Sequence, residues 1–160
     1  MMRPISHSER NAARRHLFDG LSEFSASWSA GRLVVAAPEL EDDDRIPIVT
    51  ALADGALELL FLTTFEFGES EPFQAVVAAP SEVNAWRWQF HFAEFAVVRC
   101  DFSAAVLETL DEFVLFGGDR ESIQRALGQT VEEVRAEFAT YAEEMKGACR
   151  HLPRIAEHYR

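Results

Sequence analysis

The chain has 160 residues, 48% of them hydrophobic, and its 15 lysines and arginines against 27 aspartates and glutamates give a formal net charge of −12. A chain of this size buries enough apolar surface to fold as one domain, so a single domain over 1–160 is expected. The acidity disfavours nucleic acid and anionic membrane surfaces as partners, and no apolar run approaches the ~20 residues that span a bilayer.

The N-terminal segment contains bases but no apolar signal region, which predicts a cytoplasmic location. Cys100 and Cys149 stand in no disulfide or metal-ligand spacing, so we expect reduced thiols, with Cys100 buried in the core.

Apolar residues recur at helical spacing near the N-terminus, at Leu17, Phe24 and Trp28. This spacing predicts one amphipathic helix over 8–28, ended by Gly31. The N-terminal part of the fold, 1–30, is therefore expected to be helical.

The next part, 31–102, has the character of an antiparallel sheet. Short apolar runs predict strands at 32–37, 46–52, 56–66 and 73–79. The Asp54–Gly55 pair favours a hairpin between the second and third of these. One helix over 48–64 remains the alternative.

A strict alternation follows, in which four aromatic residues interleave with polar ones. Period 2 is typical of a half-buried strand, and a further strand is expected over 95–102. The aromatic residues are Trp86, Trp88, Phe90 and Phe92, and the polar ones are Arg87, Gln89 and His91.

The last part, 103–160, is predicted to be helical. Ser103 can cap a helix that carries Val106, Leu110 and Phe113, and Asp119 can cap a second, short helix. Thr130 with Glu133 forms a capping box before a regular apolar stripe that ends at Gly147, and a last short helix follows Pro153. The expected fold class is α+β: an N-terminal helix, an antiparallel five- or six-stranded meander sheet, and C-terminal helices packed on one face.

The negative charge is concentrated in the middle of the chain. Residues 31–118 hold sixteen acids and four bases. In a meander, alternate connections lie at the same end of the sheet, so the segments 39–45 and 66–72 are expected to form neighbouring loops. Their carboxylates would make one acidic rim. Such a rim can be a solvated surface that keeps the protein soluble, a docking site for a basic partner, or a calcium-type site, although the run from Asp42 to Asp44 lacks the alternating ligands and central glycine of an EF-hand loop. The rim consists of Glu39, Glu41, Asp42, Asp43, Asp44, Glu66, Glu69 and Glu71.

A second candidate site uses the alternating strand. A base, an amide and an imidazole on one strand face can bind an anionic ligand, and aromatic residues can line a pocket. The alternative function is therefore a small-molecule-binding domain or enzyme with a pocket between sheet and helices. Its candidate residues are Arg87, Gln89, His91, Trp86 and Trp88.

The sequence contains none of the familiar nucleophile, phosphate-loop, dinucleotide or zinc-protease motifs, so no catalytic residue, metal site or cofactor is expected. The favoured function is a non-enzymatic interaction protein that binds a basic protein partner through the acidic rim and neutralises or chaperones it. Size, acidity and helix–sheet–helix order are shared at class level with toxin-immunity proteins and secretion chaperones. The basic ends of the chain can pair with the acidic rim of a second copy, which makes a homodimer a further expectation.

Overall fold

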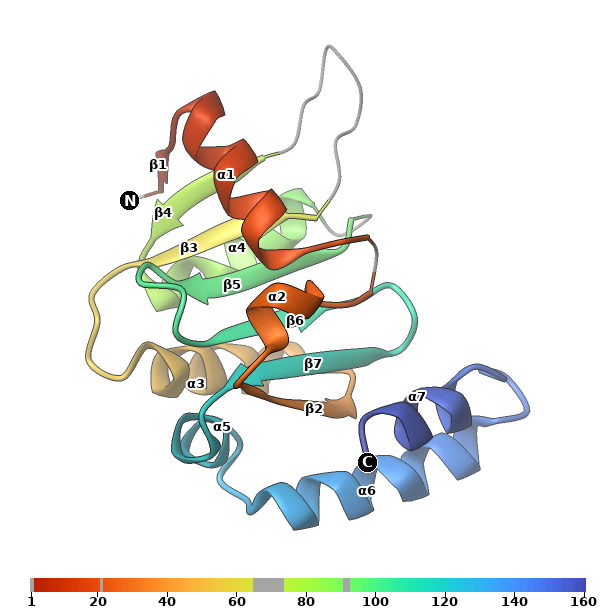
Figure 1. The fold of residues 1–160 in the computed structure, drawn as a ribbon. Helices are drawn as coiled ribbons and strands as arrows, with labels where there is room; N and C mark the ends of the chain where they lie inside the picture. The colour runs from red at the N-terminus through yellow and green to blue at the C-terminus, as the bar shows by residue number, and fades with distance from the viewer. Residues whose placement is uncertain (1, 21, 65–73, 91–92) are drawn as a thin grey trace.

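The computed structural model describes residues 2–20, 22–64, 74–90 and 93–160. Within these ranges the chain forms one seven-stranded antiparallel sheet with helices on both of its faces (Figure 1). The α+β fold class, with an N-terminal helix and C-terminal helices, is confirmed. The expected five or six strands are too few. None of the described helices is long and apolar enough to cross a membrane.

The sheet combines a meander with a separate hairpin. Strands β5, β6 and β7 follow one another along the chain and pair with their sequence neighbours. The order across the sheet is β1-β4-β3-β5-β6-β7-β2, so β2 and β3 are separated by other strands although they are consecutive in the chain. The prediction that all strands form a single meander is therefore wrong at the connection between β2 and β3. The strands are β1 (Arg3–Pro4), β2 (Leu33–Pro38), β3 (Leu59–Thr63), β4 (Ala75–Ala78), β5 (Phe95–Arg99), β6 (Ala105–Glu108) and β7 (Phe113–Gly118).

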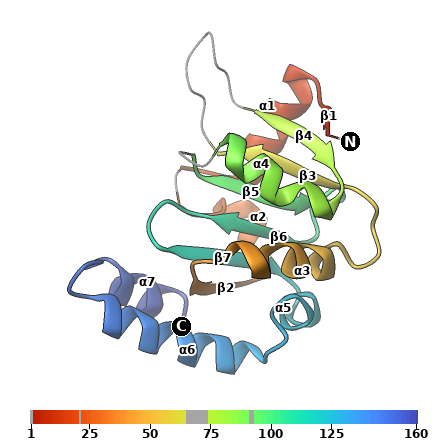
Figure 2. The same cartoon turned by 180° about the vertical axis from the view of Figure 1, so that it is seen from behind.

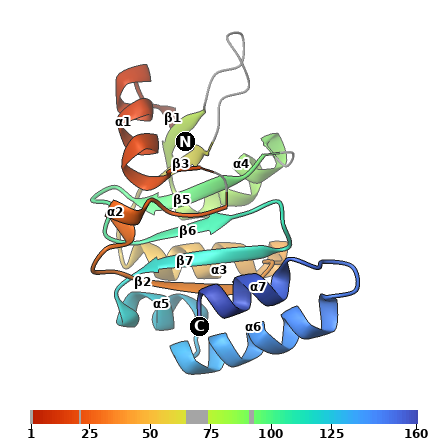
Figure 3. The ribbon, with the colours of Figure 1, turned by 45° about the vertical axis from the view of Figure 1, so that its right-hand side comes forward.

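Two hydrophobic cores lie on opposite faces of the sheet. One contains Trp28 and packs under α1 and α2 (Figure 1). The other contains Phe61 and Trp86 and packs under α3, α4 and α5, which Figure 2 shows from behind. Helix α6 runs along the β2 edge with α7 beside it (Figure 3) and contributes Val134 to one core and Phe138 to the other. The helices are α1 (His7–Leu17), α2 (Ala26–Ser29), α3 (Asp42–Ala53), the 3-10 turn η1 (Pro80–Glu82), α4 (Val83–Gln89), α5 (Arg120–Leu127), α6 (Val131–Met145) and α7 (Leu152–His158).

The single N-terminal helix predicted over 8–28 is wrong, because the chain turns between α1 and α2. Ser25 fixes this turn: its N–H donates to the Leu17 carbonyl over 2.6 Å, and its hydroxyl accepts from the Trp28 N–H. The carboxylate of Asp19 caps the start of α2. Leu17 and Trp28 still reach the same core, but they do so from two short helices.

The strand predicted over 46–52 is helix α3, and the alternative helix over 48–64 is also wrong. The helix ends at Ala53, and β3 begins at Leu59. Asp54 and Gly55 both adopt a positive φ, of 51° and 85°. A positive φ serves a helix C-terminus as well as a hairpin turn, so the Asp–Gly pair did not distinguish the two.

The helix predicted after Ser103 is wrong as well, because this segment forms the β6–β7 hairpin. Apolar residues occupy successive positions here, since the strands are buried on both faces. A continuous apolar run shows neither the period of 2 of a half-buried strand nor the period of 3.6 of an amphipathic helix, so it is easily mistaken for a helix. The Thr109 hydroxyl donates to the Phe113 carbonyl and closes the turn, in which Glu112 adopts a φ of 70°.

Candidate functional site

The acidic segment after β2 is the start of a helix, not the loop that the sequence predicted. Glu41 is the N-cap residue of α3, and its backbone is extended. The next three residues, Asp42, Asp43 and Asp44, form the first turn, and all of these carboxylates are exposed. Negative charge is favourable at this position because the helix dipole presents its positive end there.

Arg45 follows these acids but turns its side chain into the protein. Its guanidinium is completely buried and donates two hydrogen bonds to the Glu108 carboxylate, over 2.8 and 3.0 Å. The remaining N–H groups bond to Asp42, to the Asn84 amide oxygen at 2.9 Å and to the Leu40 carbonyl at 2.9 Å. All of its donors are satisfied, so Arg45 is a structural residue that ties α3 to β6 and α4.

Consequently, little positive charge remains to balance the exposed acids. Asp42 contacts Arg45, whose hydrogen bond lowers the pKa of Asp42, and it lies 3.7 Å from Arg87. Among the described residues, Glu41, Asp43 and Asp44 form no ion pair. The protein therefore presents an uncompensated negative surface at the start of α3.

Glu39 lies beside this surface, but its environment is different. Burial raises the pKa of Glu39, and a hydrogen bond with Glu112 and the charge of that residue raise it further. The two carboxyl groups come from the end of β2 and from the β6–β7 turn. The environment of Glu39 therefore shifts its pKa upward, whereas that of Asp42 is shifted downward.

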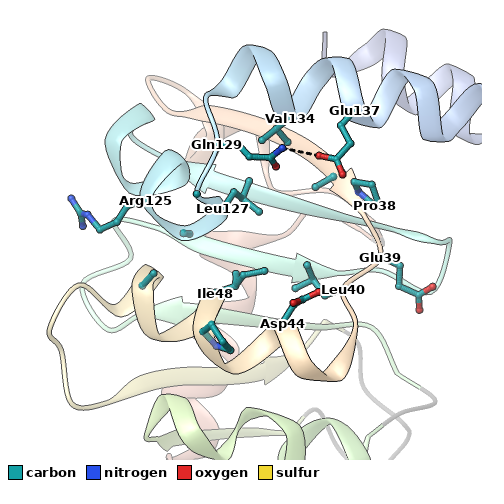
Figure 4. A pocket seen from close by; sticks show the side chains of 15 residues that line it. Pro38, Glu39, Leu40, Asp44, Ile48, Arg125, Leu127, Gln129, Val134 and Glu137 are labelled. Carbon is teal, nitrogen blue, oxygen red and sulfur yellow. Dashed lines mark hydrogen bonds between the residues drawn. The ribbon is translucent and has the colours of Figure 1, made fainter.

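A groove runs from this acidic surface along α3 (Figure 4). Its volume is about 500 Å³, and α3 forms one wall while α5 and α6 form the other. The carboxylates of Asp44 and Glu137 point into it from opposite walls. The lining residues are Ala37, Pro38, Glu39, Leu40, Asp44, Pro47, Ile48, Ala51, Arg125, Ala126, Leu127, Gly128, Gln129, Val134 and Glu137.

Glu137 and the apolar part of the groove are absent from the sites that the sequence predicted. Glu137 falls outside the apolar stripe of α6, so no pattern in the sequence marked it as a site residue. Its carboxylate accepts a hydrogen bond from the Gln129 side chain at 3.0 Å, and its backbone belongs to a helix far along the chain from Asp44. No local sequence signal connects these residues, because only the packing of α6 against β2 brings them together.

Part of the predicted rim falls outside the described residues. Glu66, Glu69 and Glu71 belong to this part, so their proximity to the start of α3 stays a prediction. The same applies to the position of His91.

The second predicted site changes character because its residues lie on a helix and not on a strand. Trp86 in α4 and Phe90, the C-cap residue of this helix, are four positions apart, and their rings contact at a tilt of 45° with 4.3 Å between ring centroids. Trp86 is buried, whereas Trp88 is 70% exposed and Gln89 is exposed. The two tryptophans therefore do not share a face, and the period-2 interpretation is wrong.

Arg87 is directed at the buried ion pair. Its guanidinium lies 3.8 Å from the Glu108 carboxylate and 3.7 Å from that of Asp42, and 30% of the side chain is exposed. It lines a small hollow of about 100 Å³ with Glu39 and Thr109. This space holds little more than a few water molecules.

The two cysteines differ in their exposure to solvent. Cys100 is exposed, so its predicted burial is wrong, and Cys149 is half-buried. Across the ranges that the structure describes, no three His, Cys, Asp or Glu side chains come together in a metal-binding group.

Comparison with known proteins adds no assignment: no family model, curated protein or solved structure matches this chain.

Proposed function

We propose that this protein is a non-enzymatic interaction protein that binds a basic protein partner through the acidic surface at the start of α3. The effect of binding is to neutralise or chaperone that partner. One observation carries the proposal: Glu41, Asp43 and Asp44 are exposed and lack ion-pair partners among the described residues. The guanidinium of the neighbouring Arg45 does not balance their charge, because it is buried and hydrogen-bonded to Glu108. An uncompensated field of this kind attracts cationic surfaces and speeds association, by roughly 10- to 1,000-fold in favourable cases.

The acids also have a simpler role, which any test must separate from binding. Carboxylates in the first turn of a helix stabilise it by about 0.3–1 kcal/mol each. Stabilisation of α3 requires negative charge near the helix end, but it requires no partner. Asp42 has a structural role too, because it accepts a hydrogen bond from Arg45. It is therefore left unchanged in the experiment.

The experiment compares wild type with the neutralised variant Glu41→Gln/Asp43→Asn/Asp44→Asn. Immobilised protein is exposed to an extract of the source organism at low and high salt, and retained proteins are identified by mass spectrometry. We expect wild type to retain a basic protein at low salt and to lose it at high salt, because screening weakens exposed charge pairs. The neutralised variant should retain far less of it.

A matched control removes the same number of charges elsewhere, in the variant Glu23→Gln/Glu143→Gln/Glu144→Gln. These three side chains are exposed, and none of them lines the groove beside the start of α3. The control should retain the basic protein as wild type does. Equal retention by wild type and the neutralised variant, with both folded by circular dichroism, would show that the proposal is wrong.

A further inference from the structure

The groove between α3 and α6 has an apolar interior as well as an acidic mouth. Ile48, Leu127 and Leu40 are each only half-buried, so they present apolar surface to the hollow. Its volume of about 500 Å³ lies within the range of roughly 300–1,000 Å³ that is usual for ligand-binding pockets. An occupant with an aliphatic side chain would remove this surface from water.

The charges on the groove are unequal at its two ends. At the mouth, Asp44 and Glu137 point inward from opposite walls, and neither forms an ion pair among the described residues (Figure 4). At the other end, Arg125 is paired with Asp54 at 2.7 Å and Glu121 at 3.1 Å. Its side chain points away from the hollow. The interior thus favours a cation at the mouth, and its described lining offers no free cation to an anionic ligand.

We infer that this groove holds a segment of the basic partner in which an aliphatic side chain stands next to an arginine or lysine. The aliphatic group would pack on Ile48 and Leu127, and the cation would lie between the carboxylates of Asp44 and Glu137. Arginine suits the position because its planar guanidinium can donate to two carboxylates at once. This inference rests on the proposed function, since it names the part of the partner that the acidic surface attracts.

Charge complementarity selects a peptide segment over other occupants. Nucleic acid and anionic small molecules would be repelled by the two inward carboxylates. A metal ion would not use the apolar interior. A purely basic surface would be attracted to the acids but would leave Ile48 and Leu127 exposed, so it gains nothing from the groove.

The test uses two short synthetic peptides of equal charge and length, labelled with fluorescein. In one, arginine alternates with leucine; in the other, arginine alternates with serine. We expect wild type to bind the arginine–leucine peptide about tenfold or more tightly, because a buried aliphatic group contributes roughly 10- to 200-fold in a hydrophobic pocket. Backbone amide NMR signals of Ile48, Leu127 and Val134 should shift on binding.

Two groove variants, Ile48→Gln and Leu127→Gln, are matched with Leu57→Gln, which makes the same kind of change at a side chain that is 85% exposed outside the groove. Each groove variant should lose most of the preference for leucine, and Leu57→Gln should keep it. Using two groove variants protects the test if one of them does not fold.

The outcomes separate this inference from the proposed function. If both peptides bind equally to wild type and only the loss of Glu41, Asp43 and Asp44 charge weakens them, the groove inference is wrong and the proposed function stands. Absence of peptide binding by a protein that retains a basic partner leads to the same conclusion. If the arginine–leucine peptide binds in the groove but no basic protein is retained from the extract, the preference of the groove for an aliphatic–basic segment stands, whereas the proposed binding of a basic protein partner is wrong.

Discussion

Removing the guanidinium of Arg45 should weaken the attachment of α3 to the sheet and lower the free energy of unfolding. In Arg45→Met, the Glu108 carboxylate, which is 5% exposed, loses the two hydrogen bonds that compensate its charge. Removing one partner of a buried ion pair typically costs about 3–5 kcal/mol, because the other charge stays buried and unpaired. We expect a loss of that size in the free energy of unfolding at pH 7.

The structure supplies two comparisons for this variant. Arg87→Met removes a partly exposed guanidinium 3.8 Å from the same carboxylate, so its cost should stay below about 1 kcal/mol. The double variant Arg45→Met/Glu108→Leu replaces the whole pair by apolar side chains. It should recover most of the stability that Arg45→Met loses, because neither charge is left behind.

The loss should also depend on pH. Burial raises the pKa of Glu108, while Arg45 lowers it, so removing Arg45 raises the pKa of Glu108 further. A carboxyl group whose folded pKa is raised destabilises the protein above that pKa and ceases to do so as the pH falls toward its ordinary value of 4.5. The difference in stability between wild type and Arg45→Met should therefore shrink from pH 7 to pH 5.

Urea denaturation followed by tryptophan fluorescence at the two pH values measures all of these quantities. A cost for Arg45→Met no larger than that for Arg87→Met would refute the assignment of Arg45 as the partner that compensates Glu108. An equal cost at pH 5 and pH 7 would refute it too, because an unpaired buried carboxylate must respond to protonation.

Three further predictions concern single residues. Gly117→Ala should lower the free energy of unfolding by about 1–3 kcal/mol in urea melts, because a Cβ there would lie 2.5 Å from the Trp28 ring; an unchanged midpoint would contradict this. Asp119→Ala should cost about 1 kcal/mol at pH 7, since Asp119 caps α5 by accepting from the Ser122 N–H. That hydrogen bond lowers the pKa of Asp119, so its contribution is present at neutral pH and is lost as the pH falls through the lowered value; a cost that persists at pH 2 would argue against it. Cys100 should react with iodoacetamide more slowly at pH 8 than a free peptide thiol does, because partial desolvation of its sulfur and the nearby carboxylates of Glu58 and Asp101 raise the pKa of its thiol; an equal rate by mass spectrometry would exclude this.

Local signals in the sequence were sufficient where the structure depends on local bonds. Asp119 caps α5 and Thr130 caps α6, as predicted, because each cap joins residues only three positions apart. Strands β2 and β5 were also predicted close to their observed positions. Their β-branched residues suit a strand in any packing.

Periodicity failed where the sheet is covered on both faces. The β6–β7 hairpin has no alternation because both of its faces are buried, and it was interpreted as a helix. Helix α4 is short, and its Trp86 and Phe90 satisfy a spacing of two and of four alike. Which of the two holds depends on the neighbours that the chain packs against.

The sequence by itself determined that the charge excess lies in the middle of the chain and that Glu41 to Asp44 are its densest part. Only the tertiary structure decided which positive charges lie near those acids and which groove they border. The fold removes Arg45 from the surface by pairing it with Glu108, and it brings α6 against β2 so that Glu137 faces Asp44 across an apolar groove. Both results depend on contacts between residues far apart in the chain, which local pattern cannot encode.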